Sequence, residues 1–245
     1  MEGLQSWWAT IKADFYRCFI QDDRWKYLTE GLGNTLKLTF FAVLIGIAIG
    51  VVVAMVRSTY DKQSKEMHNG PAKWILCILN VVAKVYLTVI RGTPVIVQLL
   101  IMNLVILVST DNKILVGTLA FGINSGAYVA EIIRSGIMSV DNGQFEAGRS
   151  LGFNYMQTMW YVVIPQALKS VLPALANEFI VLLKETSVAG YIALMDLTRA
   201  TDILKGITYN AYMPLFAVAL IYLVMVMFFT FLVNKLERRL RNSER

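Results

Sequence analysis

Ionisable side chains with the spacing of an ion pair lie inside otherwise apolar stretches of this sequence. Glu131 and Arg134 are three residues apart, so on a helix they share a face and can pair. Charged groups at membrane depth are costly and usually face the protein interior or a water path. We expect a structural ion pair here, which Arg91 can join because it stands near the same end of its own segment. Asn177 and Glu178 are given structural roles.

Two further groups of polar residues have the chemistry to bind a small zwitterion. Asn124 and Ser125 stand about ten residues inside their apolar segment, and a rise of about 1.5 Å per residue brings them close to the middle of a bilayer. The hydroxyls of Thr186 and Ser187 can receive a carboxylate, and Glu185 an ammonium group. The alternative is structural for both groups: hydrogen bonds between helices for the first, and a capped helix end with a lysine–glutamate contact for the second.

The composition indicates that these residues belong to a membrane protein. The chain has 245 residues, of which 56% are apolar and 16% charged, whereas soluble domains average about 25% charged residues. The net charge of +6 requires no nucleic-acid partner, because the basic residues flank apolar spans, where they set orientation. The chain has two cysteines, Cys18 and Cys77, which lie on opposite sides of the first predicted span and are not expected to form a disulfide. Its one histidine, His68, lies in a polar loop, which argues against a metal site and against histidine-based catalysis. We therefore predict no metal ligand and no catalytic residue.

Several apolar segments approach the length of about 20 residues that crosses a bilayer. The predicted spans are residues 38–56, 94–108, 114–138, 167–189 and 215–233. Residues 74–90 are also apolar, but Asn80, Lys84 and Thr88 fall on one helical face. This segment can therefore lie along the membrane surface or cross the membrane, and the sequence leaves the two alternatives open.

Small residues recur at every fourth position of the first span. They are Ala42, Gly46, Gly50 and Ala54. Small side chains at this spacing let a second helix approach closely, so we predict that this stripe serves packing and not chemistry.

The amino-terminal segment, residues 1–33, carries charges throughout and shows no apolar core of a signal peptide. Within it, Trp8, Ile11, Phe15 and Phe19 recur at helical spacing. Such a helix would lie in the membrane interface with its aromatic face toward the lipid. A loose polar tail is the alternative.

Five spans place the two termini on opposite sides of the membrane. The loops at 57–73 and 139–169 and the carboxy-terminal tail carry eleven basic residues, against eight on the other side. Basic residues favour the cytoplasm, so we expect the tail inside. An odd number of spans without a repeat argues against the inverted-repeat plan of many secondary transporters. The expected parts are an extracytoplasmic or interfacial segment 1–33, a transmembrane domain 34–236 with a cytoplasmic loop 139–166, and a basic tail 237–245.

The polar segment 139–166 contains the signals of two short helices joined at a glycine. Capping residues begin both helices, a glycine suits the left-handed end of the first, and a proline stands at the end of the second. These residues are Asp141 with Gln144, Gly152, Asn154 with Gln157, and Pro165. Ala147 and Gly148 leave little side-chain bulk on the first helix. We expect that its smooth face either fits a groove of another protein or belongs to a helical hairpin without a partner.

The pattern of this loop resembles the cytoplasmic EAA loop of importer permeases of the ABC class. The matching residues are Glu146-Ala147-Gly148, Gly152 and Val162-x-Ile164-Pro165, with glycine for the second alanine and valine and isoleucine for the usual aliphatic pair. Four other motifs resemble the polar amino-acid branch of that family: Arg91-Gly92-Thr93-Pro94, Gly126-Ala127-Tyr128-x-x-Glu131-x-x-Arg134, Gly143-Gln144 and Lys184-Glu185-Thr186-Ser187. The resemblance covers roughly residues 31–240.

The resemblance implies an all-α integral membrane protein with the five-span type I importer (MetI-like) permease fold. It implies a second permease copy or paralogue, an extracytoplasmic binding protein that delivers a polar amino acid, and a location in the bacterial cytoplasmic membrane. The implied substrate-binding residues are Asn124, Ser125, Tyr128, Glu185, Thr186 and Ser187. The implied docking residues for ABC ATPase subunits are Gln144, Glu146, Ala147, Gly148, Gly152 and Pro165.

The sequence contains no phosphate-loop motif of the form G-x-x-x-x-G-K-[ST]. We therefore expect no enzyme activity and no cofactor on this chain, with ATP and Mg²⁺ on the partner ATPase. Two other classes compete with this interpretation. An ATP-independent carrier or channel for small polar solutes would transport without an ATPase, and a membrane-embedded enzyme would need a clustered catalytic set.

Overall fold

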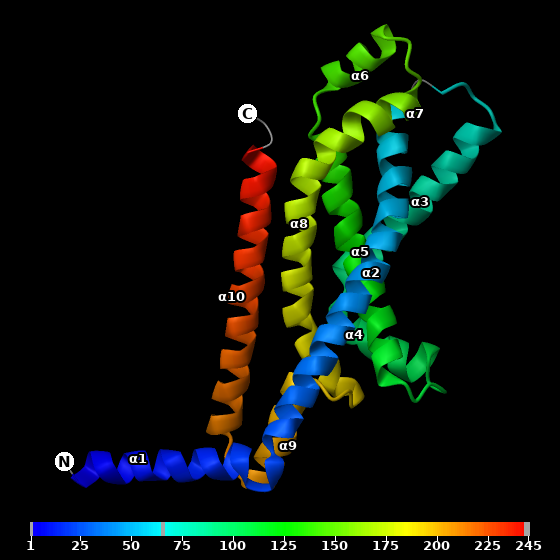
Figure 1. The fold of residues 1–245 in the computed structure, drawn as a ribbon. Coiled ribbons are helices and arrows are strands. Elements are labelled where there is room, and N and C mark those ends of the chain that lie inside the picture. Colours follow the sequence, from blue (N-terminus) through cyan, green and yellow to red (C-terminus); the bar gives the residue numbers. More distant parts are fainter. Residues whose placement is uncertain (1, 65–66, 243–245) are drawn as a thin grey trace.

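The computed structural model describes residues 2–64 and 67–242, which are almost entirely helical (Figure 1). The elements are α1 (Glu2–Phe15), η1 (Tyr16–Ile20), η2 (Gln21–Asp23), α2 (Trp25–Gln63), α3 (Pro71–Gly92), α4 (Val95–Ile101), η3 (Met102–Ile106), α5 (Lys113–Met138), α6 (Asn142–Ser150), α7 (Tyr155–Thr158), η4 (Met159–Val163), α8 (Ile164–Glu185), η5 (Thr186–Ile192), α9 (Leu197–Thr208) and α10 (Tyr212–Asn242). Within the described residues, five segments are long and apolar enough to cross a membrane: Trp25–Gln63, Pro71–Gly92, Lys113–Met138, Tyr155–Ile192 and Tyr212–Leu240. The chain is a multi-pass membrane protein.

The second of these segments is α3, so the prediction of a span at residues 94–108 was wrong. That region forms only the shorter apolar helices of Val95–Ile106. The polar face that suggested a surface helix is partly used inside the protein, because Asn80 is buried and accepts a 2.6 Å hydrogen bond from Arg57 Nη1 of α2. In Figure 1, α3 begins at the end of the molecule that carries α6, and α4 lies toward the opposite end.

The contact between α2 and α5 forms the centre of the molecule. The predicted small-residue stripe of α2 is buried at all four positions, Ala42, Gly46, Gly50 and Ala54, and it faces α5. A Cβ atom on Gly46 would come within 3.0 Å of Ser125 Oγ, and one on Gly50 would overlap the Val129 side chain. The stripe therefore serves packing, as predicted.

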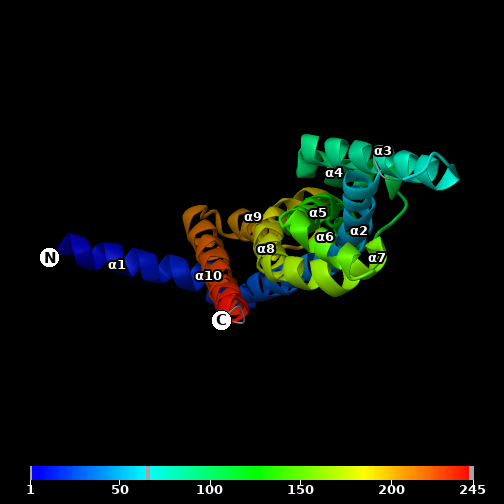
Figure 2. The ribbon, with the colours of Figure 1, turned by 90° about the horizontal axis from the view of Figure 1, so that it is seen from above.

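Helix α5 supplies glycines of its own to the same contact. A Cβ atom on Gly122 would lie 2.7 Å from Ile45 Cγ2, and one on Gly126 would lie 3.0 Å from Ile49 Cβ. Glycines of each helix thus receive side chains of the other, and the two backbones approach closely. Figure 2 shows α5 at the middle of the bundle, where it packs against α2, α3, α4 and α8.

The two ends of the molecule carry different elements (Figure 1). Helices α6 and α7, the end of α2, the start of α3 and the last described turns of α10 lie at one end, whereas α1 and α9 lie at the other. The three segments with the basic excess therefore share one end. That this end faces the cytoplasm stays a prediction.

Helix α9 lies between the predicted fourth and fifth spans, residues 167–189 and 215–233, where the sequence analysis predicted no element. Asp196 caps its start, since Asp196 Oδ1 accepts a 2.7 Å hydrogen bond from the Arg199 N–H. Asn34 of α2 donates a 2.8 Å bond to the Met195 carbonyl, so α9 is attached to the start of α2. Burial raises the pKa of Asp196 to about 6, against hydrogen bonds from backbone N–H groups that lower it.

Adding one methyl group at the α2–α5 contact tests its importance. We expect Gly50→Ala to destabilise the purified protein by about 1–3 kcal/mol, because the contact leaves no space for the added atom. The measurement is thermal unfolding in detergent. Gly33→Ala is the matched control in the same helix, since a Cβ atom there meets nothing within 4 Å.

Adding Val129→Ala to Gly50→Ala should restore part of the lost stability, because it removes the side-chain carbon nearest to the new methyl group. Equal effects of Gly50→Ala and Gly33→Ala would contradict the close approach of the two helices.

Candidate functional site

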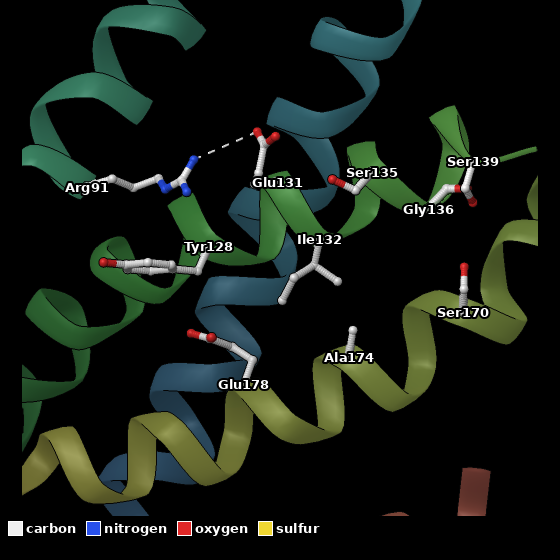
Figure 3. Close-up of a pocket in the computed structure, with 10 residues that line it drawn as sticks. All are labelled: Arg91, Tyr128, Glu131, Ile132, Ser135, Gly136, Ser139, Ser170, Ala174 and Glu178. Atoms are coloured by element: carbon white, nitrogen blue, oxygen red, sulfur yellow. Dashed lines mark hydrogen bonds and ion pairs between the residues drawn. The ribbon is translucent and has the colours of Figure 1, made fainter. Parts of the chain in front are cut away.

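A cavity of about 440 Å³ lies between the end of α3, the second half of α5, and α8 (Figure 3). Its charged and aromatic lining consists of Arg91, Tyr128, Glu131 and Glu178. The remaining lining residues are small or aliphatic: Ile132, Ser135, Gly136, Ser139, Ser170 and Ala174. The cavity therefore combines a mostly neutral wall with charges of both signs.

The positive side of the cavity is Arg91, at the end of α3. Its guanidinium carbon lies 5.6 Å from the ring centre of Tyr128, and its Nη1 lies 4.0 Å from Glu131 Oε2. Glu131 also accepts hydrogen bonds of 2.6 Å and 3.3 Å from Arg134. The structure thus brings together the three residues that the sequence proposed for an ion pair, and two arginines share one carboxylate.

This group extends into a network that sequence reasoning missed. Arg134 Nη1 lies 3.2 Å from Asp61 Oδ2 of α2, and Arg57 Nη1 lies 3.8 Å from Asp61 Oδ1. The network therefore connects α2, α3 and α5 near one end of the spans. The available signal was the spacing of four residues between Arg57 and Asp61, which places both on one face of a helix. It was overlooked because Arg57 was assigned to a loop.

The negative side of the cavity is Glu178 of α8, which the sequence analysis had treated as structural. Ser125 is fully buried beside the α2–α5 contact and donates a 3.0 Å hydrogen bond to Glu178 Oε1. In residues 2–64 and 67–242, no basic side chain forms an ion pair with Glu178. Figure 3 shows Glu178 and Arg91 reaching from α8 and α3 toward the side of α5 that carries Tyr128.

Asn124 stabilises the interruption between helices α3 and α4 through hydrogen bonds. Its Nδ2 donates a 3.0 Å hydrogen bond to Gln98 Oε1, and Gln98 Nε2 donates bonds of 2.8 Å to the Ile90 carbonyl and to Thr93 Oγ1. These bonds satisfy polar groups that the helix break would otherwise leave without partners. The geometry thus favours the structural alternative for Asn124.

The motif at the end of α8 lies outside the lining of this cavity. Thr186 is fully buried and donates a 2.8 Å hydrogen bond to the Leu183 carbonyl of its own helix. Ser187 and Glu185 are half-buried, and Glu185 stands two helical turns beyond Glu178. The structure therefore brings Tyr128 together with Arg91 and Glu178. Glu185, Thr186 and Ser187, which the sequence also predicted to bind substrate, lie elsewhere.

A second candidate surface is the hairpin of α6 and α7. Asp141 caps α6 as predicted, since its Oδ1 accepts a 2.6 Å bond from the Gly143 N–H. The predicted reciprocal cap from Gln144 was wrong: its side chain instead accepts a 3.0 Å bond from Gln166 of α8. Gly152 has a φ of +81° and ends α6 in the left-handed conformation, as predicted.

The small residues of α6 face different directions. Gly148 is buried, because a Cβ atom there would lie 2.6 Å from Thr158 Oγ1 of α7. The prediction that Gly148 belongs to an exposed smooth face was therefore wrong: its lack of a side chain lets α6 and α7 close on each other. The outward face consists of Glu146, Ala147, Ser150 and Leu151.

The hairpin continues without a break into the α8 span. Asn154 and Gln157 form the predicted capping box at the start of α7. From there the chain is helical through the π-helical segment η4, and Pro165 occupies the first turn of α8 instead of ending a helix. Phe145 of α6 is buried in a cluster with Ile137 of α5 and with residues of η4 and α8. Helix α6 therefore packs against both the end of α5 and the start of the α8 span.

Comparison with known proteins shows which family this chain resembles. Residues 76–242 match the family described as binding-protein-dependent transport system inner membrane component. The arginine transport system permease protein ArtQ of Bacillus subtilis (strain 168) is 35% identical over 222 residues, which cover 89% of this chain and 94% of that protein.

Solved structures agree in fold. A chain of the crystal structure of an amino acid ABC transporter with histidines has a TM-score of 0.76 and 44% sequence identity, covering 87% of this chain and 94% of that chain. A chain of the MetNI methionine ABC transporter, in an inward facing conformation, has a TM-score of 0.76 at 19% identity, covering 90% of this chain and 99% of that chain. The expected five-span type I importer fold is confirmed.

Proposed function

Because this chain belongs to the family of binding-protein-dependent transport system inner membrane components, we propose that it is the permease subunit of an ABC importer for polar amino acids. A separate ATPase subunit binds ATP and Mg²⁺ and supplies the energy. An extracytoplasmic binding protein delivers the amino acid, and a second permease copy or a paralogue completes the pore. The hairpin and the carboxy terminus face the bacterial cytoplasm.

The observation that carries this proposal is the continuous helical path from the exposed hairpin to the cavity. Helices α7 and α8 connect through η4, and α8 carries Glu178. An ATPase that moves the hairpin would thereby move one wall of the cavity, whereas α5 remains attached to α2 through the glycine contact. Such a relative motion of two rigid parts gives alternating access.

The cavity has the chemistry that an amino acid requires. A volume of about 440 Å³ lies within the usual range of small-molecule sites. Arg91 can receive the carboxylate, Tyr128 can contact the side chain, and Glu178 can receive the ammonium group or a cationic side chain. Ser125 positions Glu178 through its hydrogen bond. In this proposal Glu178 takes the role that the sequence analysis gave to Glu185.

The ATPase docks on the outward face of α6, which Glu146, Ala147, Ser150 and Leu151 form. Leu151 has 74% of its surface exposed, and an apolar side chain at the tip of a polar hairpin is suited to a partner's groove. Gln144, Gly148, Gly152 and Pro165 act indirectly, because they hold the hairpin in shape or connect it to α8.

Bulk on the docking face tests the function. We expect Ala147→Trp to abolish co-purification of the ATPase and ATP-driven amino-acid uptake into proteoliposomes that contain the permease, the ATPase and the binding protein. The reason is that overpacking a tight contact costs about 1–3 kcal/mol. Ala72→Trp, at an exposed alanine of α3, is the matched control and should keep both properties.

Two results would reject this proposal. Ala147→Trp with normal docking and uptake would exclude α6 as the docking site. Uptake by the chain without any ATPase would favour an ATP-independent carrier or channel.

The charge of Glu178 tests the substrate site. Glu178→Gln keeps the shape of the side chain and an acceptor for Ser125, but removes the negative charge. Loss of a charge-assisted hydrogen bond costs about 1.5–3 kcal/mol, so we expect the half-saturating amino-acid concentration for uptake to rise about tenfold or more. ATPase co-purification should not change.

The matched control is Glu185→Gln, the same exchange two turns further along α8. A strong loss of apparent affinity in Glu185→Gln with normal uptake in Glu178→Gln would show that the sequence-based assignment is correct and the cavity-based one wrong.

A further inference from the structure

Helix α1 runs across the direction of the spans in Figure 1 and projects outward from the bundle in Figure 2. It starts beyond α10 and joins the rest of the chain at the end that holds α9. Its principal contact is with η1, the segment that follows it directly. Helix α1 therefore does not belong to the packed bundle, and its position needs another explanation.

The direction of α1 is set by a sharp turn of the chain between η1 and α2, here called the corner. Asp22 and Asp23 both adopt the left-handed conformation, with φ values of 53° and 55°, and so turn the chain sharply between η1 and α2. Arg24 holds this turn, since it donates a 2.6 Å hydrogen bond to the Arg17 carbonyl and lies 2.9 Å from Asp22 Oδ2. Cys18 and Phe19 are buried against Leu204 of α9, which attaches the corner to the bundle.

One face of α1 is apolar and uncovered. Trp7, Trp8 and Phe15 expose 56%, 61% and 51% of their surfaces, and with Ile11 they recur at helical spacing. Ala13 lies on the opposite face. A contiguous apolar surface of this kind marks contact with another molecule or with a membrane.

The level of α1 along the spans is marked by other aromatic residues. Trp25, Tyr209 and Tyr212 are all exposed, and they stand at the start of α2, the end of α9 and the start of α10. Tryptophan and tyrosine gather where a membrane meets water. Figure 1 shows α1 beside these helix ends, at the level along the spans that these aromatic residues mark.

The charges around this corner are neutralised internally. Arg17 pairs with Asp14 at 3.0 Å, and Lys26 pairs with Asp23 at 2.7 Å. Attraction to anionic headgroups requires a basic surface, and these pairs reduce it. Binding of α1 to a bilayer would therefore come from its apolar area.

We propose that α1 is a membrane-interfacial helix on the side of the membrane opposite to the hairpin, with the Trp7, Trp8, Ile11 and Phe15 face inserted between lipid chains. Its partner is the bilayer surface, independent of headgroup charge. Because α1 joins α2 through a fixed corner, it sets the depth at which α2 begins. The proposal takes the interfacial alternative of the sequence analysis over that of a loose polar tail.

Depth-dependent quenching tests this proposal on the full chain in lipid nanodiscs. In a Cys77→Ala background, where the remaining cysteine, Cys18, is fully buried, a bimane label is attached to Ile11→Cys or to Ala13→Cys. We expect lipids with a nitroxide high on the acyl chain to quench the label at position 11, and aqueous iodide to quench the label at position 13. Both results should be the same in phosphatidylcholine and in mixtures with phosphatidylglycerol.

Three outcomes would overturn the proposal. Equal access of iodide to both positions would mean a solvated tail. Protection of position 11 from iodide without quenching by the lipid nitroxide would mean that a protein surface, such as a second copy, covers the face. Lipid quenching that requires phosphatidylglycerol would mean electrostatic binding.

Discussion

The close approach of α2 and α5 is the constraint on which the other features of this protein depend. Helices in lipid gain little from hydrophobic association, so their packing relies on small residues that let backbones meet. Here both helices contribute glycines, and each receives side chains of the other. This contact buries Ser125 beside Gly46 and places Asp61 of α2 within reach of Arg134 of α5. The contact between α2 and α5 thereby positions one wall of the cavity and the charge network beside it.

The opposite wall of the cavity belongs to a helix with a different attachment. Helix α8 continues from the hairpin, and the hairpin closes around Gly148 and Thr158 and is anchored by the burial of Phe145. The hydrogen bond from Ser125 to Glu178 connects the two walls. A hydrogen bond between neutral groups contributes about 0.5–1.5 kcal/mol, and one to a charged group contributes about 1.5–3 kcal/mol. This free energy is small enough that docking and nucleotide binding on a partner can break the bond. We therefore propose that this bond breaks and re-forms as the α8 wall of the cavity moves relative to the α5 wall.

Sequence reasoning succeeded where the signal is local. The period of four in the α2 stripe, the Asp141 cap, the left-handed Gly152 and the capping box at Asn154 each depend on neighbours in the chain, and the structure contains all of them. It failed where the partner is distant in sequence. Gly148 looked like part of an exposed face because Thr158 was not known to oppose it.

Other failures have the same origin. Gln144 was expected to cap its own helix, but Gln166 of α8 offered a better partner. The polarity of α3 argued against a span because the contact of Asn80 with Arg57 is invisible in one segment. Likewise, nothing in the local sequence of Glu178 reveals that this residue lines a cavity. The claim that α8 moves relative to α5 is tested most directly by the dipolar coupling between two nitroxide labels. One labelled pair, Ile132→Cys with Ala174→Cys, stands on opposite walls of the cavity. The reference pair, Met55→Cys with Met138→Cys, stands on α2 and α5. In the complex with the ATPase, we predict that ATP changes the coupling of the first pair and leaves that of the second unchanged; an unchanged first pair, or an equal change in both, would contradict it.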